Sequence, residues 1–214
     1  MGFVRAITEL VARGGPLMVP LLVCSVLVVA VILERAVFFF VVGARTAAFL
    51  GRWGGRESAQ GLALVRADGR SPLERMLAAG ASPSQRNPGA ERAMERAAAE
   101  EVERMERHLP VLDVSVTVAP LMGLLGTIVG MMNSFGIMSR AGVSQPHAIT
   151  GGIAQALLTT AVGLTIAIVA FIAYSIFQAL VARHVRLLER TAEDVLRSMR
   201  PDADQAQTGP AAAG

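Results

Sequence analysis

The chain has no lysine, a single cysteine and few aromatic residues. Its one cysteine, Cys24, cannot form a disulfide within the chain and lies in an apolar run, where it is typical of a small buried hydrophobe. All 20 basic residues are arginine, against 17 acidic residues. In residues 91–107 arginine alternates with glutamate and no aromatic ring is interleaved, so the local charge nearly cancels. This pattern indicates that the chain does not bind nucleic acid.

The residue patterns of common catalytic and metal sites are also lacking. The three histidines, His108, His147 and His184, are isolated from one another, and no cluster of cysteines or carboxylates gives them metal-ligand spacing. There is no G-x-S-x-G elbow for a serine nucleophile, and no glycine-rich loop followed by Lys and Ser/Thr for a nucleotide. We therefore expect no enzyme activity, no metal and no cofactor.

What the sequence does have is long apolar runs, at residues 16–33, 114–138 and 151–177. The first run holds 18 residues, which as a helix cover about 27 Å and nearly match the hydrocarbon core of a bilayer. Phe38 to Val42 can extend it. Because no A-x-A cleavage site follows, we interpret this run as a retained span and not as a signal peptide. The sequence predicts an all-α membrane protein with three transmembrane helices and lipid as its surroundings.

The distribution of arginine predicts the orientation of these spans. Eleven arginines lie between Arg45 and Arg107 and five between Arg183 and Arg200. Under the positive-inside rule both blocks are cytoplasmic, so the N-terminus is expected in the periplasm and the C-terminus in the cytoplasm. We expect five segments. Residues 1–43 hold the N-terminal part and the first span, and residues 44–110 form a cytoplasmic helical region. The second and third spans with a short periplasmic loop are expected at 111–182, a cytoplasmic helix extension at 183–200, and a disordered tail at 201–214.

Local signals predict several element boundaries. Ser71 and Glu74 have capping-box spacing with Pro72 at the first helical position. Residues 81–89 are rich in Ser, Pro and Gly and predict a loop. A striped helix follows, with apolar residues at Met94, Ala98, Val102, Met105 and Leu109. We expect it to continue without a break into the second span, where Pro120 either kinks or ends it, and we expect residues 139–150 to connect the last two spans.

Small and hydroxyl residues return to one side of the second and third spans. Such faces are typical of close helix packing or of an interior lined by both helices. The predicted packing positions are Gly123, Gly126, Gly130, Gly152 and Gly163.

Polar side chains in the membrane are candidates for a wet interior, and they are Thr127, Thr159, Thr160 and Gln155. The alternative for each threonine is a hydroxyl that bonds only to its own helix. The second and third spans contain no Asp, Glu, Lys or His, so the chain cannot relay protons by itself. Glu34 and Asp113 lie near span ends, where each either pairs with an arginine such as Arg35 or anchors the boundary.

The stretches 119-APLMGLLGTIVGMMNSF-135 and 151-GGIAQALLTTAVGLTIAI-168 resemble the two signature spans of the MotA/TolQ/ExbB proton-channel family. The resemblance extends to 14-GGPLMVPLLVCSVLVVAVILERAVFF-39 and 61-GLALVRADGRSPLERMLAAG-80. Three spans favour the ExbB/TolQ branch over the four-span MotA branch. One departure is Gln155, which stands where well-studied ExbB and TolQ proteins have glutamate.

The resemblance implies a subunit of a proton-driven motor in the bacterial inner membrane. It implies a pentamer whose second and third spans surround single-span helices of an ExbD/TolR-type partner, which brings the proton-carrying Asp, with a TonB-like protein as a further partner in transport across the outer membrane. Thr127 and Thr160 match the family threonines that face this Asp, and Glu34 with Arg35 matches a structural Glu-Arg pair. The alternatives are a TolQ-like envelope or gliding motor and a non-conducting membrane scaffold.

Overall fold

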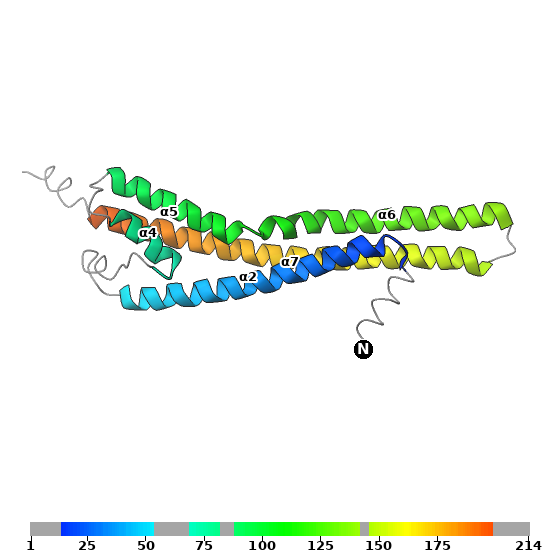
Figure 1. Cartoon of the computed structure of the whole chain (residues 1–214), viewed down its shortest axis with the longest axis horizontal. Coiled ribbons are helices and arrows are strands. Elements are labelled where there is room, and N and C mark those ends of the chain that lie inside the picture. The colour runs from blue at the N-terminus through cyan, green and yellow to red at the C-terminus, as the bar shows by residue number, and fades with distance from the viewer. Residues whose placement is uncertain (1–13, 54–68, 82–87, 142–145, 199–214) are drawn as a thin grey trace, which may run out of the picture. The chain divides into compact units, whose positions relative to one another are not determined.

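A computed structural model of the chain describes residues 14–53, 69–81, 88–141 and 146–198. These residues form five α-helices and no strand (Figure 1), which confirms the predicted all-α class. The predicted tail at 201–214 and most of the predicted loop at 81–89 lie outside the described residues. The helices are α2 (Met18–Trp53), α4 (Pro72–Gly80), α5 (Pro88–Glu106), α6 (Leu109–Ala141) and α7 (Pro146–Ser198).

Three stretches of the described chain are long and apolar enough to cross a membrane, as the sequence predicted. They fall in α2, in the chain from α5 through α6, and in α7. Many large apolar side chains on these helices are exposed, for example Phe40 at 80% and Val26 at 67%. An exposed apolar surface of this extent is stable against lipid or against further membrane helices, but not against water.

The helix that leads into the second span is interrupted, although we expected it to continue into that span without a break. α5 ends at Glu106, a turn follows at Arg107 and His108, and α6 begins at Leu109. Pro110 explains the break, because it has no N–H to donate and its ring would clash with the carbonyl of Glu106 in a continuous helix. The expectation of one uninterrupted helix was wrong because this proline was not treated as a breaker.

The other proline of this region, Pro120, lies inside α6 and does not end it. The connection after α6 is shorter than the predicted 139–150, since α6 extends to Ala141 and α7 begins at Pro146. A proline in the first helical position has its φ preset and loses no hydrogen bond, which accounts for the early start of α7.

The chain divides into two compact units. The first comprises Met1–Arg35 and His108–Gln178, and the second comprises Ala36–Arg107 and Ala179–Gly214. In the first unit, α6 and α7 run antiparallel and in close contact, because residues late in α6 meet residues early in α7. This contact holds most of the predicted site residues.

The second unit has an apolar core built from four helices. Phe49 of α2, Leu77 of α4, Met94 of α5 and Val195 of α7 are all buried in it. The predicted capping box of α4 is confirmed: the Ser71 hydroxyl accepts from the Glu74 N–H and the Glu74 carboxylate accepts from the Ser71 N–H, each at 3.1 Å.

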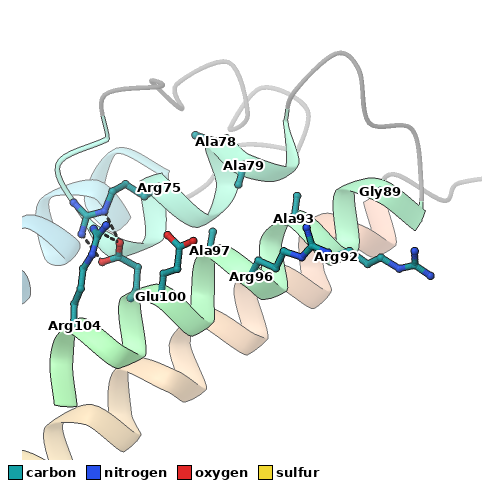
Figure 2. A pocket seen from close by; sticks show the side chains of 11 residues that line it. Arg75, Ala78, Ala79, Gly89, Arg92, Ala93, Arg96, Ala97, Glu100 and Arg104 are labelled. Carbon is teal, nitrogen blue, oxygen red and sulfur yellow. Dashed lines mark hydrogen bonds and ion pairs between the residues drawn. The ribbon is translucent and has the colours of Figure 1, made fainter. Parts of the chain in front are cut away.

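An ion-pair cluster joins α4 to α5 in this unit (Figure 2). The Glu101 carboxylate, 5% exposed, accepts hydrogen bonds from Arg75 of α4 and from Arg104 one turn further along α5. The hydrogen bonds to Glu101 raise the pKa of the Arg75 guanidinium above its ordinary value, so this group stays charged at any physiological pH. A groove between α4 and α5 begins at this cluster, and Ala78 and Ala79 of α4 line it together with Ala93 and Ala97 of α5.

Candidate functional site

The contact between α6 and α7 depends on glycine at several positions. A Cβ at Gly163 of α7 would lie 2.5 Å from the backbone oxygen of Ala119 and 3.2 Å from Cα of Gly123. A Cβ at Gly123 would lie 3.0 Å from Cα of Thr160. Backbone atoms cannot move aside as a flexible side chain can, so larger residues would force the helices apart. Small residues allow such close approach of membrane helices.

The remaining predicted packing glycines lie in the same contact. A Cβ at Gly126 would lie 2.8 Å from Thr159 Cβ, and one at Gly130 would lie 2.8 Å from Ala156 Cβ. Gly152 lies against Ser134, whose hydroxyl donates to the Gly130 carbonyl over 3.1 Å. The structure therefore brings all five glycines together along one seam, which we call the α6–α7 seam.

Two partly exposed threonines belong to this face: Thr160 lies in the contact itself, and Thr127 lies one turn after Gly123 on the same side of α6. The Thr160 hydroxyl donates to the Gly123 carbonyl across the seam over 2.8 Å. The Thr127 hydroxyl donates to the Leu124 carbonyl of its own helix over 2.6 Å. A threonine hydroxyl can also accept a hydrogen bond while it donates, so both retain a free acceptor site.

Thr159, next to Thr160, has a different environment. It is 1% exposed, and its hydroxyl lies 3.1 Å from the Gly14 carbonyl and 2.8 Å from the Gln155 carbonyl. A hydroxyl has one hydrogen, which is shared between these two acceptors. Thr159 therefore ties the segment before α2 to α7.

Gln155 faces the same segment. Gly15 has a positive φ of 73°, and a Cβ there would collide with the Gln155 amide. Only glycine adopts this conformation without strain while leaving room for the amide. Of the four predicted pore residues, Thr159 and Gln155 thus lie against the segment before α2, while Thr127 and Thr160 are partly exposed and have no contact with that segment among the interactions described above.

Large apolar side chains surround these two threonines on α6 and α7. On α6, Leu124 is 55% exposed and Ile128 is 51% exposed, on either side of Thr127. On α7, Leu157 is 64% exposed and Leu164 is 47% exposed, one turn before and after Thr160. The hydroxyls are consequently isolated polar groups in an apolar surface.

At the end of the first span Glu34 pairs with Arg35, one of the two alternatives that the sequence left open, and His108 joins them, which the sequence did not predict. Arg35, 2% exposed, donates to the Glu34 carboxylate over 2.9 Å, and its guanidinium lies 2.8 Å from Nδ1 of His108. The same Nδ1 lies 2.9 Å from the Glu34 carboxylate. When Nδ1 carries a hydrogen it donates to Glu34, and when it carries none it accepts from Arg35.

The sequence described His108 only as isolated from the other histidines, and its contact with Glu34 and Arg35 was not predicted. His108 directly follows Arg107, the last arginine of the first block, whereas Arg35 lies ten residues before Arg45, the first of that block. Their shared place near the ends of apolar spans is the one signal that could have found the contact. Asp113 is exposed and, among the described residues, makes no ion pair.

The fold and its exposed apolar surface define a multi-pass helical membrane protein. Residues 68–190 match the MotA/TolQ/ExbB proton channel family. The chain belongs to this family, and its three spans and its relatives place it in the ExbB/TolQ branch.

Curated relatives carry both names of this branch. The ExbB-like 3 biopolymer transport protein of Synechocystis sp. is 31% identical over 90% of this chain and 94% of its own length. The Tol-Pal system protein TolQ of Pseudomonas aeruginosa is 42% identical over 42% of this chain and 39% of its own. The biopolymer transport protein ExbB of Salmonella typhimurium is 37% identical over 41% of this chain and 36% of its own.

Proposed function

We propose that this chain is the channel subunit of a proton-driven motor in the bacterial inner membrane, and that it works with a single-span partner of the ExbD/TolR type. The observation that carries the proposal is the pair Thr127 and Thr160. Both are polar, partly exposed and surrounded by apolar side chains on the α6–α7 seam. Polar groups in such a place serve a pathway more often than a lipid contact.

A second argument concerns the proton carrier. Residues 114–138 and 151–177 contain no acidic or basic side chain, and Gln155 can hydrogen-bond but cannot carry a proton. A carboxyl group on a partner helix would supply the missing carrier. Once protonated it is neutral and can pass the apolar wall, while the free acceptor sites of the two threonines bind its O–H.

The energy for movement comes from the membrane. A proton that crosses the membrane potential yields about 2.3 kcal/mol per 100 mV, which is sufficient to turn a partner between equivalent positions in a ring. The names of the relatives support two processes that the motor could drive. One is biopolymer transport, with a TonB-like protein as the further partner, and the other is an envelope role of the TolQ kind. The match to the ExbB-like relative extends over nearly its full length, which favours transport.

The test is co-purification of the full chain, in mild detergent, with the ExbD/TolR-type protein encoded beside it, followed by native mass spectrometry. We expect a ring of this chain around a minority of partner chains, five around two by resemblance to the family. In liposomes this complex should conduct protons, and Thr127→Val should reduce the flux.

The matched control is Thr165→Val. Thr165 of α7 is exposed and, like Thr127, donates to a carbonyl of its own helix, that of Ala161, over 2.8 Å. It lies about 140° around α7 from Thr160, so it is off the face that carries the proposed pathway. An equal loss of proton flux in both variants would contradict the proposal that Thr127 takes part in the proton pathway. A stable homo-oligomer that never retains such a partner would instead support the non-conducting scaffold.

A further inference from the structure

A groove lies between α2 and α7 in the second unit, apart from the α6–α7 seam. Its volume is about 460 Å³. Phe39, Gly43 and Leu50 of α2 line one wall, and Leu180 and Leu187 belong to the other. The groove thus has apolar walls along both helices.

Its charge comes from α7 and has one sign. Arg183, Arg186 and Arg190 line the groove at spacings of three and four residues, which place them on one helical face. All three are exposed, and among the described residues none makes an ion pair. None of the described residues that line the groove carries a carboxylate, so the charge of its lining is positive. A ligand for it should carry a negative charge.

The residues that line the groove follow shortly after the first and the third apolar runs of the sequence. Arg183 is the first charged residue of the chain after Arg140, and Arg45, two residues from Gly43, is the first arginine after the end of the first apolar run at Glu34 and Arg35. Arginines in such positions lie at the membrane–water interface, where the headgroups are.

Beside the groove there is one buried polar group that has no hydrogen-bond partner among the described residues. Thr46 lines the groove and is 5% exposed, and its hydroxyl makes no hydrogen bond within the described residues. A buried hydroxyl without a partner is costly, and most helical threonines avoid this by bonding to a carbonyl of the preceding turn. An oxygen-rich ligand in the groove would supply the partner if the Thr46 side chain changed to the χ1 rotamer that turns its hydroxyl into the groove.

We propose that this groove binds the headgroup of an anionic phospholipid. The three arginines contact its phosphate and the acyl chains continue along Phe39 and Leu180. A soluble anion would match the arginines but would leave the apolar walls unused, whereas a lipid matches both. The site thus favours anionic lipid at the boundary that the motor shares with its membrane.

The experiment is native mass spectrometry of the full chain after exchange into detergent with equal amounts of phosphatidylglycerol and phosphatidylcholine that have the same acyl chains. We expect preferential retention of phosphatidylglycerol. The triple substitution R183Q/R186Q/R190Q should lower its retention about tenfold or more, because each interfacial arginine adds to the attraction. The control R92Q/R96Q/R197Q removes the same charge from exposed positions elsewhere in the same unit and should have little effect.

A second variant tests the groove itself without changing its charge. A Cβ at Gly43 meets no atom within 4 Å, so Gly43→Leu fills the groove without disturbing the helix. It should also lower phosphatidylglycerol retention. Retention unchanged in Gly43→Leu, equal loss in the two triple variants, or displacement of the lipid by free glycerol phosphate would each overturn the proposal.

Discussion

The hydroxyl of Thr160 reaches across the seam to the carbonyl of Gly123, over 2.8 Å, while its neighbour Thr159 bonds in another direction to Gly14. Two adjacent threonines of one helix therefore contact two different parts of the first unit. Removing either hydroxyl should lower stability, because each donates to another segment, but only removal of the Thr160 hydroxyl should also reduce conduction.

Thr160→Val should reduce proton flux per assembled complex about tenfold or more, because valine keeps the shape of threonine but cannot bind the O–H of a protonated carboxyl. Thr160→Ser, which keeps the hydroxyl, should retain most of the flux. The measurement is dye-monitored proton uptake into liposomes with the partner present. A Thr160→Ser variant as inactive as Thr160→Val would show that the methyl group, and not the hydroxyl, is required.

Thr159→Val should lower stability by about 1–2 kcal/mol and leave flux per assembled complex nearly unchanged, since it leaves the Gly14 carbonyl without its donor in a buried place. Thermal unfolding in detergent, followed by intrinsic fluorescence or aggregation, measures the first effect. If instead flux falls and stability does not, Thr159 acts in the pathway with Thr127, as the sequence suggested.

Gly163→Ala should destabilise the first unit by about 1–3 kcal/mol, because the new methyl group meets the backbone of Ala119 and Gly123. The control is Gly136→Ala on α6, where a Cβ meets nothing within 4 Å and the higher helix propensity of alanine should stabilise slightly. Melting temperatures of the two variants in the same detergent should move in opposite directions. If both melting temperatures moved in the same direction, Gly163 would not lie in a close contact between α6 and α7.

Glu101→Gln should weaken the attachment of α4 to α5 by about 1–3 kcal/mol, since a buried carboxylate that binds two arginines is replaced by a neutral amide. Glu103→Gln, an exposed neighbour, should change stability by less than about 0.5 kcal/mol. Hydrogen exchange of the full chain, read at peptides from α4 and α5, separates the two. Unchanged protection in both variants would mean that the apolar core alone holds these helices.

Local features of this fold could be predicted from the sequence, and contacts between distant residues could not. Ser71, Pro72 and Glu74 determine a helix start within four residues, so their spacing suffices. The glycines of the seam were recognisable as packing positions, but their neighbours depend on how α6 and α7 pair. The bond from Thr159 to Gly14 joins residues 145 apart, and nothing local to either residue indicates it.

The same limit explains the unexpected cluster at the end of the first span. Glu34 and Arg35 were visible as a charged pair, but His108, 73 residues beyond Arg35, had no local signal for joining them. The helix break before it, in contrast, was predictable from Pro110 alone. It was missed because the apolar stripe of α5 continues to Leu109 in the sequence pattern and suggested an unbroken helix.

That break at Arg107 and His108 has a consequence for how the chain tolerates change in length. In a continuous helix, one inserted residue turns everything beyond it by about 100°. Because α6 is a separate helix that begins at Leu109, the direction in which Gly123, Gly126 and Gly130 face depends on their distance from the start of α6 and not on the length of α5. Insertions and deletions within α5 can therefore accumulate while the glycine face of α6 keeps its direction.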